Sequence, residues 1–265
     1  MHTKAEGLLE YEQNLPVYGK NAVQELLQSG TEVDTVYINT GMHEKQAAFY
    51  TALAKEAGAV VKRVHAAKLQ SLAQSENHQG VLAFAASVAY ASYEEIFEIA
   101  KNKNEEPFLL LAGGVEDPYN LGAIIRTAYL LGVHGVFIPK RGGVGITSAV
   151  HKASAGAAAH MPVARVANIG ETVRKLKKDN IFVYCADMDG HPPEKNNLTG
   201  GVALVVGAEG EGVSPLVKKL CDGTVSLEMP GKESSVDSFN VSVAAGIILY
   251  EIMKQRKGKG ENRNE

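Results

Sequence analysis

The 265-residue sequence contains no tryptophan, only two cysteines and few aromatic residues, which make up 6% of the chain. Cys185 and Cys221 stand in apolar or strand-like surroundings without metal-ligand spacing, which favours reduced thiols over a disulfide framework. No apolar run approaches the roughly 20 residues that cross a bilayer. The N-terminal residues also lack the positive-then-apolar pattern of a secretion signal. These absences predict a cytoplasmic protein without a membrane partner.

The sequence also lacks a large excess of charge of either sign, because it has 27 lysines and arginines and 30 acidic residues. The net charge of −3 excludes a protein coated in positive charge but allows a local basic patch that binds RNA. The histidines are scattered without ligand spacing, so no metal site is expected. The sequence has no G-x-S-x-G, Walker A or dinucleotide-binding glycine motif, and hydrophobic residues at 45% predict a packed core.

Composition and periodicity divide the chain into four parts. Residues 1–88 are predicted to hold a small α/β unit, with helices over 17–29 and 45–57 and strands over 33–38 and 80–86. Residues 89–106 are predicted to be a linker that contains a helix, and 257–265 a flexible basic tail. From 107 to 256, apolar strands alternate with helices, which predicts a parallel sheet covered on both faces.

Three polar or glycine-rich segments lie next to apolar elements of this second part. Asn120 is predicted to cap a helix, and a glycine-rich turn over 207–212 follows a buried strand. Ser238 and Asn240 open the last helix, which is apolar nearly all round and is therefore expected to be buried. Ligands of such sheets bind beyond the carboxyl ends of the strands, so we expect the segments to form one composite site.

Each of these features also has an ordinary structural interpretation. The glycine-rich segment suits a tight turn as well as a ligand loop, and its Glu209 and Glu211 would repel a phosphate but accept a cation or hydroxyl groups. A single arginine such as Arg126 is usually solvated, although its apolar neighbours Ile124 and Ile125 favour partial burial. A guanidinium placed there could hold a phosphate or a carboxylate with two hydrogen bonds. Ser238 has no evident His–Asp partner, which argues against a hydrolase triad.

Together the three segments resemble the motifs of the SpoU (TrmH-type) RNA 2′-O-ribose methyltransferases of the SPOUT class. The matching stretches are residues 120–128 (NLGAIIRTA), 205–212 (VVGAEGEG) and 238–246 (SFNVSVAAG). Residues 17–23 (VYGKNAV) and 78–81 (HQGV) resemble the ribosomal-protein-L30e-like substrate-binding domain of members that act on 23S ribosomal RNA. The chain departs from the family in having Phe239 for leucine, LEM at 227–229 for Ile-Pro-Met, and a longer loop over 232–237.

The resemblance implies a fold, a cofactor and partners. An L30e-like RNA-binding domain over 1–88 would precede an α/β methyltransferase domain over 107–256 that is tied in a deep trefoil knot. S-adenosylmethionine would lie in the knot against Gly207, Leu227 and Phe239. The protein would act as a homodimer through its methyltransferase domain, with RNA as the other partner.

The resemblance also implies residue roles. Arg126 would contact an RNA phosphate and activate the ribose hydroxyl, and because a guanidinium resists deprotonation we favour phosphate anchoring over action as a base. Positioning roles in catalysis would fall to Asn120, Glu209, Ser238 and Asn240. Lys140, Arg141 and Lys152 are predicted to extend the RNA contact beyond Arg126.

The sequence leaves other functions open beside methylation of 23S ribosomal RNA. One is 2′-O-ribose methylation of transfer RNA, whose enzymes commonly lack the N-terminal domain. A second, suggested by the altered residues 227–229, is an RNA-binding assembly factor without catalysis. A third is an antibiotic-resistance methylase of the same family.

Overall fold

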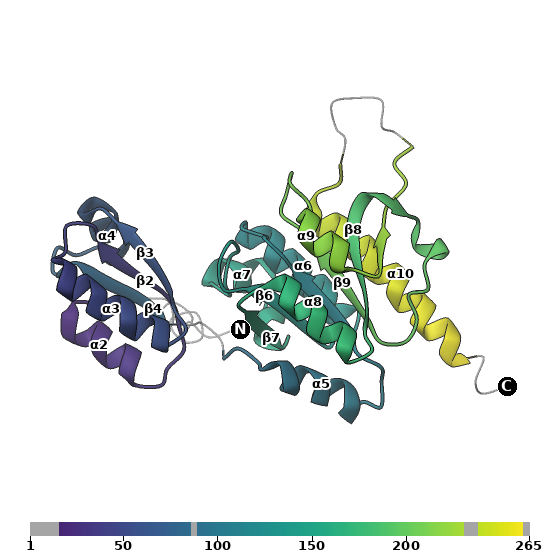
Figure 1. Ribbon diagram of the computed structural model, residues 1–265, viewed down its shortest axis with the longest axis horizontal. Coiled ribbons are helices and arrows are strands. Elements are labelled where there is room, and N and C mark those ends of the chain that lie inside the picture. The colour runs from purple at the N-terminus through teal and green to yellow at the C-terminus, as the bar shows by residue number, and fades with distance from the viewer. Residues whose placement is uncertain (1–15, 86–88, 231–237, 262–265) are drawn as a thin grey trace, which may run out of the picture. The chain divides into compact units, whose positions relative to one another are not determined.

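The structure is a computed structural model that describes residues 16–85, 89–230 and 238–261 (Figure 1). The chain separates into two compact units with the division between Ala89 and Tyr90, and Ile146–Ser148 are grouped with the first unit. The predicted long loop over 232–237 lies outside the described residues.

The first unit is a mixed four-stranded sheet with three helices. The strand order is β1 (Val17–Tyr18), β4 (Val81–Ala85), β2 (Val33–Asn39) and β3 (Val60–Val64), and only the β2–β3 pair is parallel. The helices are α2 (Lys20–Gln28), α3 (Glu44–Glu56) and α4 (Ala66–Ala73). The helix predicted over 17–29 begins late, because Val17 and Tyr18 pair with β4 and Gly19, at φ 93°, turns the chain.

The second unit is built on a six-stranded sheet, and every strand pair in it is parallel. The order is β10 (Gly223–Val225), β8 (Phe182–His191), β9 (Val202–Val206), β5 (Phe108–Ala112), β6 (Gly135–Pro139) and β7 (Val163–Val166). Every residue of β5 and β9 is buried, as expected for central strands that are covered on both faces. The predicted α/β class with a parallel sheet is confirmed.

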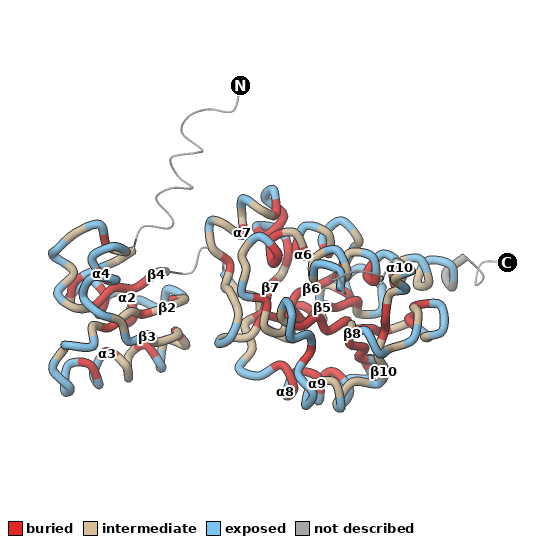
Figure 2. The backbone as a smooth tube through the Cα atoms, turned by 90° about the horizontal axis from the view of Figure 1, so that it is seen from above, coloured by how far each residue is buried: buried red, intermediate tan, exposed pale blue. Residues whose placement is uncertain are grey.

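Helices cover both faces of this sheet. They are α5 (Tyr93–Asn102), α6 (Pro118–Leu130), α7 (Ser148–Ala153), α8 (Ile169–Lys178), α9 (Pro215–Leu220) and α10 (Val241–Glu261), with short 3-10 turns at Ala157–Ala159 and Pro193–Lys195. In Figure 2 the buried strands run between α6 and α10 on one side and α8 and α9 on the other. This arrangement places α6 and α10 against each other beside the central strands.

The segment predicted to be a linker folds with the second unit instead. The Ile96 side chain of α5 is fully buried in the same cluster as Leu109 and Phe137. The Tyr93 ring stacks on Phe97 at 4.7 Å between ring centroids. The polar composition of residues 101–106 suggests a linker, but the apolar stripe of α5 requires burial, and the sheet provides it.

The last helix also differs from its prediction. It continues through Glu261 and so includes the first part of the 257–265 segment expected to be a flexible tail. Its apolar surface is only partly covered, because Val243, Ile247 and Tyr250 are 48%, 40% and 49% exposed. The helix packs one face on the sheet and α6 and leaves the other face open within the described residues. The predicted trefoil knot stays a prediction.

No helix within the described ranges combines the length and the apolar character required to span a membrane.

Candidate functional site

The three sequence motifs meet at the carboxyl ends of the central strands. The chain passes from β5 through α6 to β6 on one side, whereas β9 lies on the other side of β5, so the strand order reverses between β5 and β9. The loops that follow these two strands touch, since the Gly113 N–H donates to the Val206 carbonyl at 2.8 Å. Open parallel sheets bind ligands at such a reversal point.

Asn120, Glu209 and Asn240 form a closed hydrogen-bond network at this point. The Asn120 amide donates to Glu209 Oε2 at 3.1 Å. The Asn240 amide donates to Glu209 Oε1 at 3.0 Å and to Asn120 Oδ1 at 3.0 Å. Because each motif supplies one member, the network joins α6, the glycine-rich loop and the start of α10, as the expected composite site requires.

Asn120 does not cap its helix, contrary to the prediction. Asp117 is the N-cap of α6 and accepts hydrogen bonds from the backbone N–H groups of Tyr119 and Asn120, while Pro118 occupies the first helical position. Proline at that position and aspartate before it start the helix three residues earlier. Asn120 is thereby placed in the first turn, 9% exposed, with its side chain free to bind Glu209.

Asn240 caps α10, as predicted. Its Oδ1 accepts hydrogen bonds from the backbone N–H of Ser242 at 2.9 Å and from the Ser242 hydroxyl at 2.6 Å. The same side chain therefore starts the helix through its oxygen and joins the motif network through its nitrogen. Ser238 lies two residues earlier and is exposed.

The glycine-rich segment is a tight turn and also a wall of the site. Ala208 and Gly212 exchange backbone hydrogen bonds at 2.9 and 3.1 Å, which closes the turn, and Gly210 and Gly212 adopt positive φ. A Cβ atom added to Gly207 would stand 2.0 Å from the backbone of Gly212. The backbone can fold this tightly only with glycine at position 207.

A cavity of about 530 Å³ opens beside this turn at the carboxyl ends of β8, β9 and β10. Its walls include all three predicted cofactor residues, Gly207, Leu227 and Phe239, and also Glu209 and Asn240. The sequence prediction missed two further lining residues, Asp187 and Met188, which follow the buried part of β8. Their place just after a buried strand is the signal that could have identified them.

A second hollow, of about 320 Å³, shares Ala208, Glu209, Glu211 and Val241 with the cavity and includes Asn120 among its lining residues. The two spaces therefore adjoin at the hydrogen-bond network. A small molecule in the larger space and a second reactant in the smaller one would meet beside Asn120 and Glu209. Such an arrangement brings two reactants together without any covalent step on the protein.

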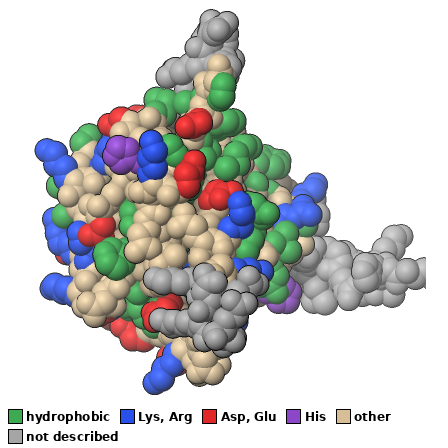
Figure 3. Space-filling model, turned by 90° about the vertical axis from the view of Figure 1, so that its right-hand side faces the viewer, with side chains coloured by type: hydrophobic (Ala, Val, Ile, Leu, Met, Phe, Trp, Pro, Cys, Tyr) green, Lys and Arg blue, Asp and Glu red, His purple; other side chains and the backbone are tan. Residues whose placement is uncertain are grey.

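The predicted RNA-contacting residues lie on the outside of the second unit. Arg126 is exposed on α6, not partly buried as its apolar neighbours suggested, because the buried positions Ile124 and Ile125 face the sheet. Among the described residues it has no hydrogen-bond or ion-pair partner. Lys140 and Arg141 follow β6, and Lys152 lies in α7. On the face shown in Figure 3, lysine and arginine side chains are interspersed with acidic and apolar ones.

The remaining titratable groups of interest lie elsewhere in the second unit. Cys185 and Cys221 are free thiols. Hydrogen bonding to Cys221 lowers the pKa of Cys185 to about 7. In the part of the chain that the structure describes, no three His, Cys, Asp or Glu side chains gather as a metal site would need.

Both units match families of known proteins. Residues 107–250 match the SpoU rRNA Methylase family, and residues 16–91 match the family of RNA 2′-O ribose methyltransferase substrate-binding domains. YacO of Bacillus subtilis (strain 168), named for the TrmH family of tRNA/rRNA methyltransferases, is 41% identical over 247 residues, which cover 92% of this chain and 97% of YacO.

Solved structures share the fold. The SpoU methyltransferase AviRb from Streptomyces viridochromogenes, in complex with the cofactor AdoMet, superimposes with a TM-score of 0.57 at 22% identity over 97% of this chain and 95% of AviRb. The A. aeolicus TrmH/SpoU tRNA modifying enzyme gives a TM-score of 0.53 at 25% identity over 63% of this chain and 85% of that enzyme. The motif network, the two matched domains and the relative of nearly equal length agree, and the chain belongs to the SpoU rRNA methylase family of RNA methyltransferases.

Proposed function

We propose that this protein transfers a methyl group from S-adenosylmethionine to a ribose 2′-hydroxyl of 23S ribosomal RNA. The observation that carries the proposal is the network of Asn120, Glu209 and Asn240, which borders both the cavity and the adjoining hollow. A methyl transfer between two bound molecules needs this kind of shared boundary, because its rate depends on holding two atoms in line at close approach.

The cavity has the chemistry expected of a site for S-adenosylmethionine. Its volume of about 530 Å³ lies within the usual range for small-molecule sites. Its charged lining residues are the three acids Asp187, Glu209 and Glu211, with no lysine or arginine among the lining residues described. When bound, S-adenosylmethionine supplies a methyl group on a sulfonium cation, and acidic walls favour a cation. Gly207, Leu227 and Phe239 would hold it through backbone and apolar contacts.

The network residues are suited to positioning. Glu209 accepts hydrogen bonds from two amides, so both of its oxygens are engaged. Asn120 and Asn240 fix that carboxylate and each other, which keeps the boundary between the two spaces rigid. Ser238, close to Asn240 in sequence, would contribute to the same wall of the cavity.

Arg126 would bind an RNA phosphate. It is exposed on α6, and a guanidinium can hold a phosphate with two hydrogen bonds while remaining charged. Proton loss from the ribose hydroxyl would then be assisted by the nearby positive charge and not by a protein base. Lys140, Arg141 and Lys152 would add contacts to the RNA backbone that carry no sequence information.

A homodimer would cover the open face of α10. Val243, Ile247 and Tyr250 on α10 and Leu130 on α6 are large apolar side chains between 40% and 72% exposed. Exposed apolar side chains on two neighbouring helices favour burial against another protein surface. A second copy of the second unit is the partner that we infer, and it would place its own Arg126 near this interface.

Ribosomal RNA is favoured over transfer RNA because of the first unit. The whole of residues 16–91 matches the substrate-binding family, and the relative named as a tRNA modifying enzyme aligns with 63% of this chain, too little to span both units. Transfer RNA remains the second candidate, since YacO is named for both substrates.

Mapping of ribose methylation tests the proposal. We expect one 2′-O-methyl site in 23S ribosomal RNA to be lost from cells that lack the protein and restored by the purified protein with S-adenosylmethionine. A site that appears in transfer RNA alone would replace the proposed substrate. If every ribose methylation is retained in cells that lack the protein, the proposed reaction is contradicted.

Substitution of Arg126 tests the residue roles. Arg126→Ala should lower the rate of methyl transfer about 100-fold with little change in S-adenosylmethionine affinity or melting temperature, because the side chain is exposed and unpaired among the described residues. Arg174→Ala, at an exposed arginine on α8 that pairs only with Glu171 in the structure, is the matched control and should keep the rate. Equal rates for both variants would remove Arg126 from the mechanism.

A further inference from the structure

Asp187 is an acidic cavity residue that the family motifs do not include. It lies on β8 just beyond the buried Cys185, borders the cavity, and its side chain is 24% exposed. Of the two other carboxylates on the cavity wall, Glu209 is engaged by Asn120 and Asn240, and Glu211 also borders the adjoining hollow. Asp187 therefore offers the cavity a carboxylate that the motif network does not use.

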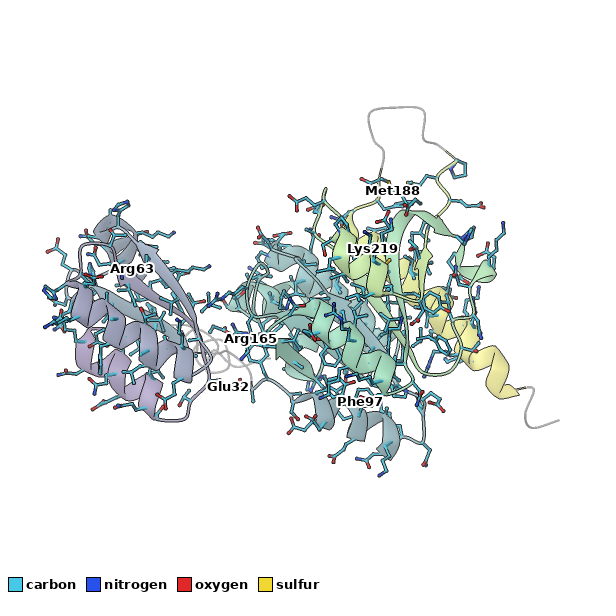
Figure 4. All side chains as sticks on the ribbon, in the orientation of Figure 1. Glu32, Arg63, Phe97, Arg165, Met188 and Lys219 are labelled. Atoms are coloured by element: carbon cyan, nitrogen blue, oxygen red, sulfur yellow. The ribbon has the colours of Figure 1, made fainter. Side chains whose placement is uncertain are left out.

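A lysine from outside the cavity holds this carboxylate. Lys218 of α9 lies 3.0 Å from Asp187 Oδ2 and also pairs with Asp189, two residues farther along β8. The hydrogen bond to Asp189 raises the pKa of Lys218, so the side chain stays a cation at neutral pH. Met188, between the two aspartates, and Lys219, next to Lys218, are labelled in Figure 4 and lie at the same end of the second unit.

The lysine holds one oxygen of Asp187 and leaves the other open to the cavity. Lys218 is shared by Asp187 and Asp189, so one ammonium faces two carboxylates and does not cancel their charge. A carboxylate has lone pairs to accept from two hydroxyl groups even while one oxygen is paired. The arrangement thus suits a ligand group with two adjacent hydroxyls.

The position of Asp187 decides which part of the cofactor it meets. In the sheet, β8 is separated from β5 by β9, so Asp187 stands on the side of the cavity away from Asn120. The reacting end of the cofactor belongs beside Asn120, where the cavity meets the adjoining hollow. Asp187 is left to contact a part of the cofactor that does not react.

We propose that Asp187 accepts hydrogen bonds from the two ribose hydroxyls of bound S-adenosylmethionine and that Lys218 is its positioning residue. The inference rests on the proposed use of this cofactor. It adds a specificity-determining side chain to a site whose other predicted contacts are backbone and apolar groups.

Calorimetry on the full-length protein tests the proposal with two probes that share the ribose. S-adenosylhomocysteine carries both the adenosine ribose and the amino-acid group, whereas 5′-methylthioadenosine carries the same adenosine without the amino-acid group. Asp187→Asn should raise the Kd of both by a similar factor of about tenfold or more, because a charged acceptor is lost from each complex. A loss confined to S-adenosylhomocysteine would mean that Asp187 meets the ammonium group, and would overturn the proposal.

Variants of the ion pairs separate binding from folding. Asp189→Asn removes the other partner of Lys218 and should change either Kd less than about twofold. Lys218→Met should weaken both probes, and Lys218→Arg should restore them, since arginine keeps the charge. If Asp187→Asn lowers the melting temperature but leaves both Kd values unchanged, the pair only ties α9 to β8 and the inference is wrong.

Wild-type protein distinguishes this inference from the proposed function. If it binds neither S-adenosylmethionine nor S-adenosylhomocysteine, the proposed function fails, and this inference fails with it. If it binds both and Asp187→Asn binds them equally well, the inference alone fails.

Discussion

The two ends of α10 are attached to the second unit by different kinds of contact. At its start, Asn240 bonds to the side chains of Asn120 and Glu209, and all three belong to sequence motifs. Toward its other end, Arg256 donates to the backbone carbonyls of Glu106, Pro107 and Gly200. Beside it, Gln255 accepts from the Leu198 N–H at 3.2 Å and donates to the Pro193 carbonyl at 2.9 Å.

The difference separates a functional contact from an anchoring one. A contact between side chains requires a particular residue on each side, so three separate motifs must carry the right amides and carboxylate. A contact to backbone carbonyls requires only one suitable donor, because every residue provides an acceptor. The start of α10 therefore carries a strong sequence signal, and the anchored end carries almost none.

The largest expected effect on methyl transfer is at the start of α10, where Asn240 joins the motif network. Asn240→Asp replaces the donor to Glu209 by a second carboxylate, so the network should open through repulsion between like charges. We expect the rate of methyl transfer to fall about 100-fold, because the boundary between the two reactants loses its geometry. Single-turnover methylation of RNA measures this. Aspartate can still cap the helix, so the melting temperature should change little.

If Asn240→Asp keeps both the wild-type rate of methyl transfer and the helix cap, the network is not needed for catalysis. Ser242→Ala is a matched control, since it removes one hydroxyl bond to Asn240 while leaving the amide donors in place. Its rate should stay within a few-fold of the wild type.

The next largest effect is on stability and concerns the other end of α10, which Arg256 anchors. Arg256→Met keeps the aliphatic part of the side chain but removes the donor to the carbonyls of residues 106, 107 and 200, of which Pro107 keeps a second donor, the Val202 N–H. Urea unfolding should show a loss of about 3 kcal/mol in the free energy of unfolding, since a hydrogen bond from a charged donor contributes about 1.5–3 kcal/mol and these acceptors are only partly buried or exposed. Methyl transfer per folded molecule should stay close to that of the wild type.

Lys254→Met is the control for this variant. Lys254 lies two residues before Arg256 on α10. It pairs locally, with Glu251 of the same helix, and its side chain is 53% exposed. Its loss should change stability by less than about 1 kcal/mol. Equal losses for the two variants would mean that the carbonyl contacts of Arg256 do not anchor the helix.

The smallest effect concerns a buried histidine near the anchored end. The His134 Nδ1 atom accepts a hydrogen bond from the Phe108 N–H at 3.0 Å, and Nε2 lies 3.2 Å from Glu105 Oε2. Burial lowers the pKa of His134 below its ordinary value of 6.5, although the charge of Glu105 opposes this. Below about pH 6.5 the unfolded chain therefore binds more protons than the folded one, and stability falls as the pH is lowered.

Unfolding in urea at pH 7.5 and at pH 5.5 measures this dependence. His134→Gln removes the titrating group, so the variant should lose less stability than the wild type on acidification. A wild type that gained stability on acidification relative to the variant would show that the Glu105 contact outweighs burial.

Much of the second unit could be predicted from local sequence. The strands β5 and β9 are continuous apolar runs, as strands covered on both faces must be, and such runs are visible in the sequence. The motif segments that carry Asn120, Glu209 and Asn240 were predicted to form one site, because open parallel sheets bind ligands beyond the carboxyl ends of their strands.

Other features could not be predicted because they depend on neighbours distant in sequence. The start of α6 was misplaced because Asp117 and Asn120 are both residue types that cap helices; Asp117 is the cap, and the Asn120 side chain binds the distant Glu209 instead. The burial of Ile96 depends on the sheet beneath α5. The place of Asp187 after a buried strand is a local signal, but its pairing with Lys218 could not be predicted because that lysine lies on another element.

The sequence alone determined which residues are candidates for the chemistry and which strands are buried, because residue type and apolar pattern act over a few neighbouring positions. Tertiary structure decided which of those residues touch. It also decided that α10 keeps one apolar face open and that a cavity forms between β8, β9 and β10. Contacts between segments more than 100 residues apart depend on how the sheet orders its strands, and no local pattern specifies that order.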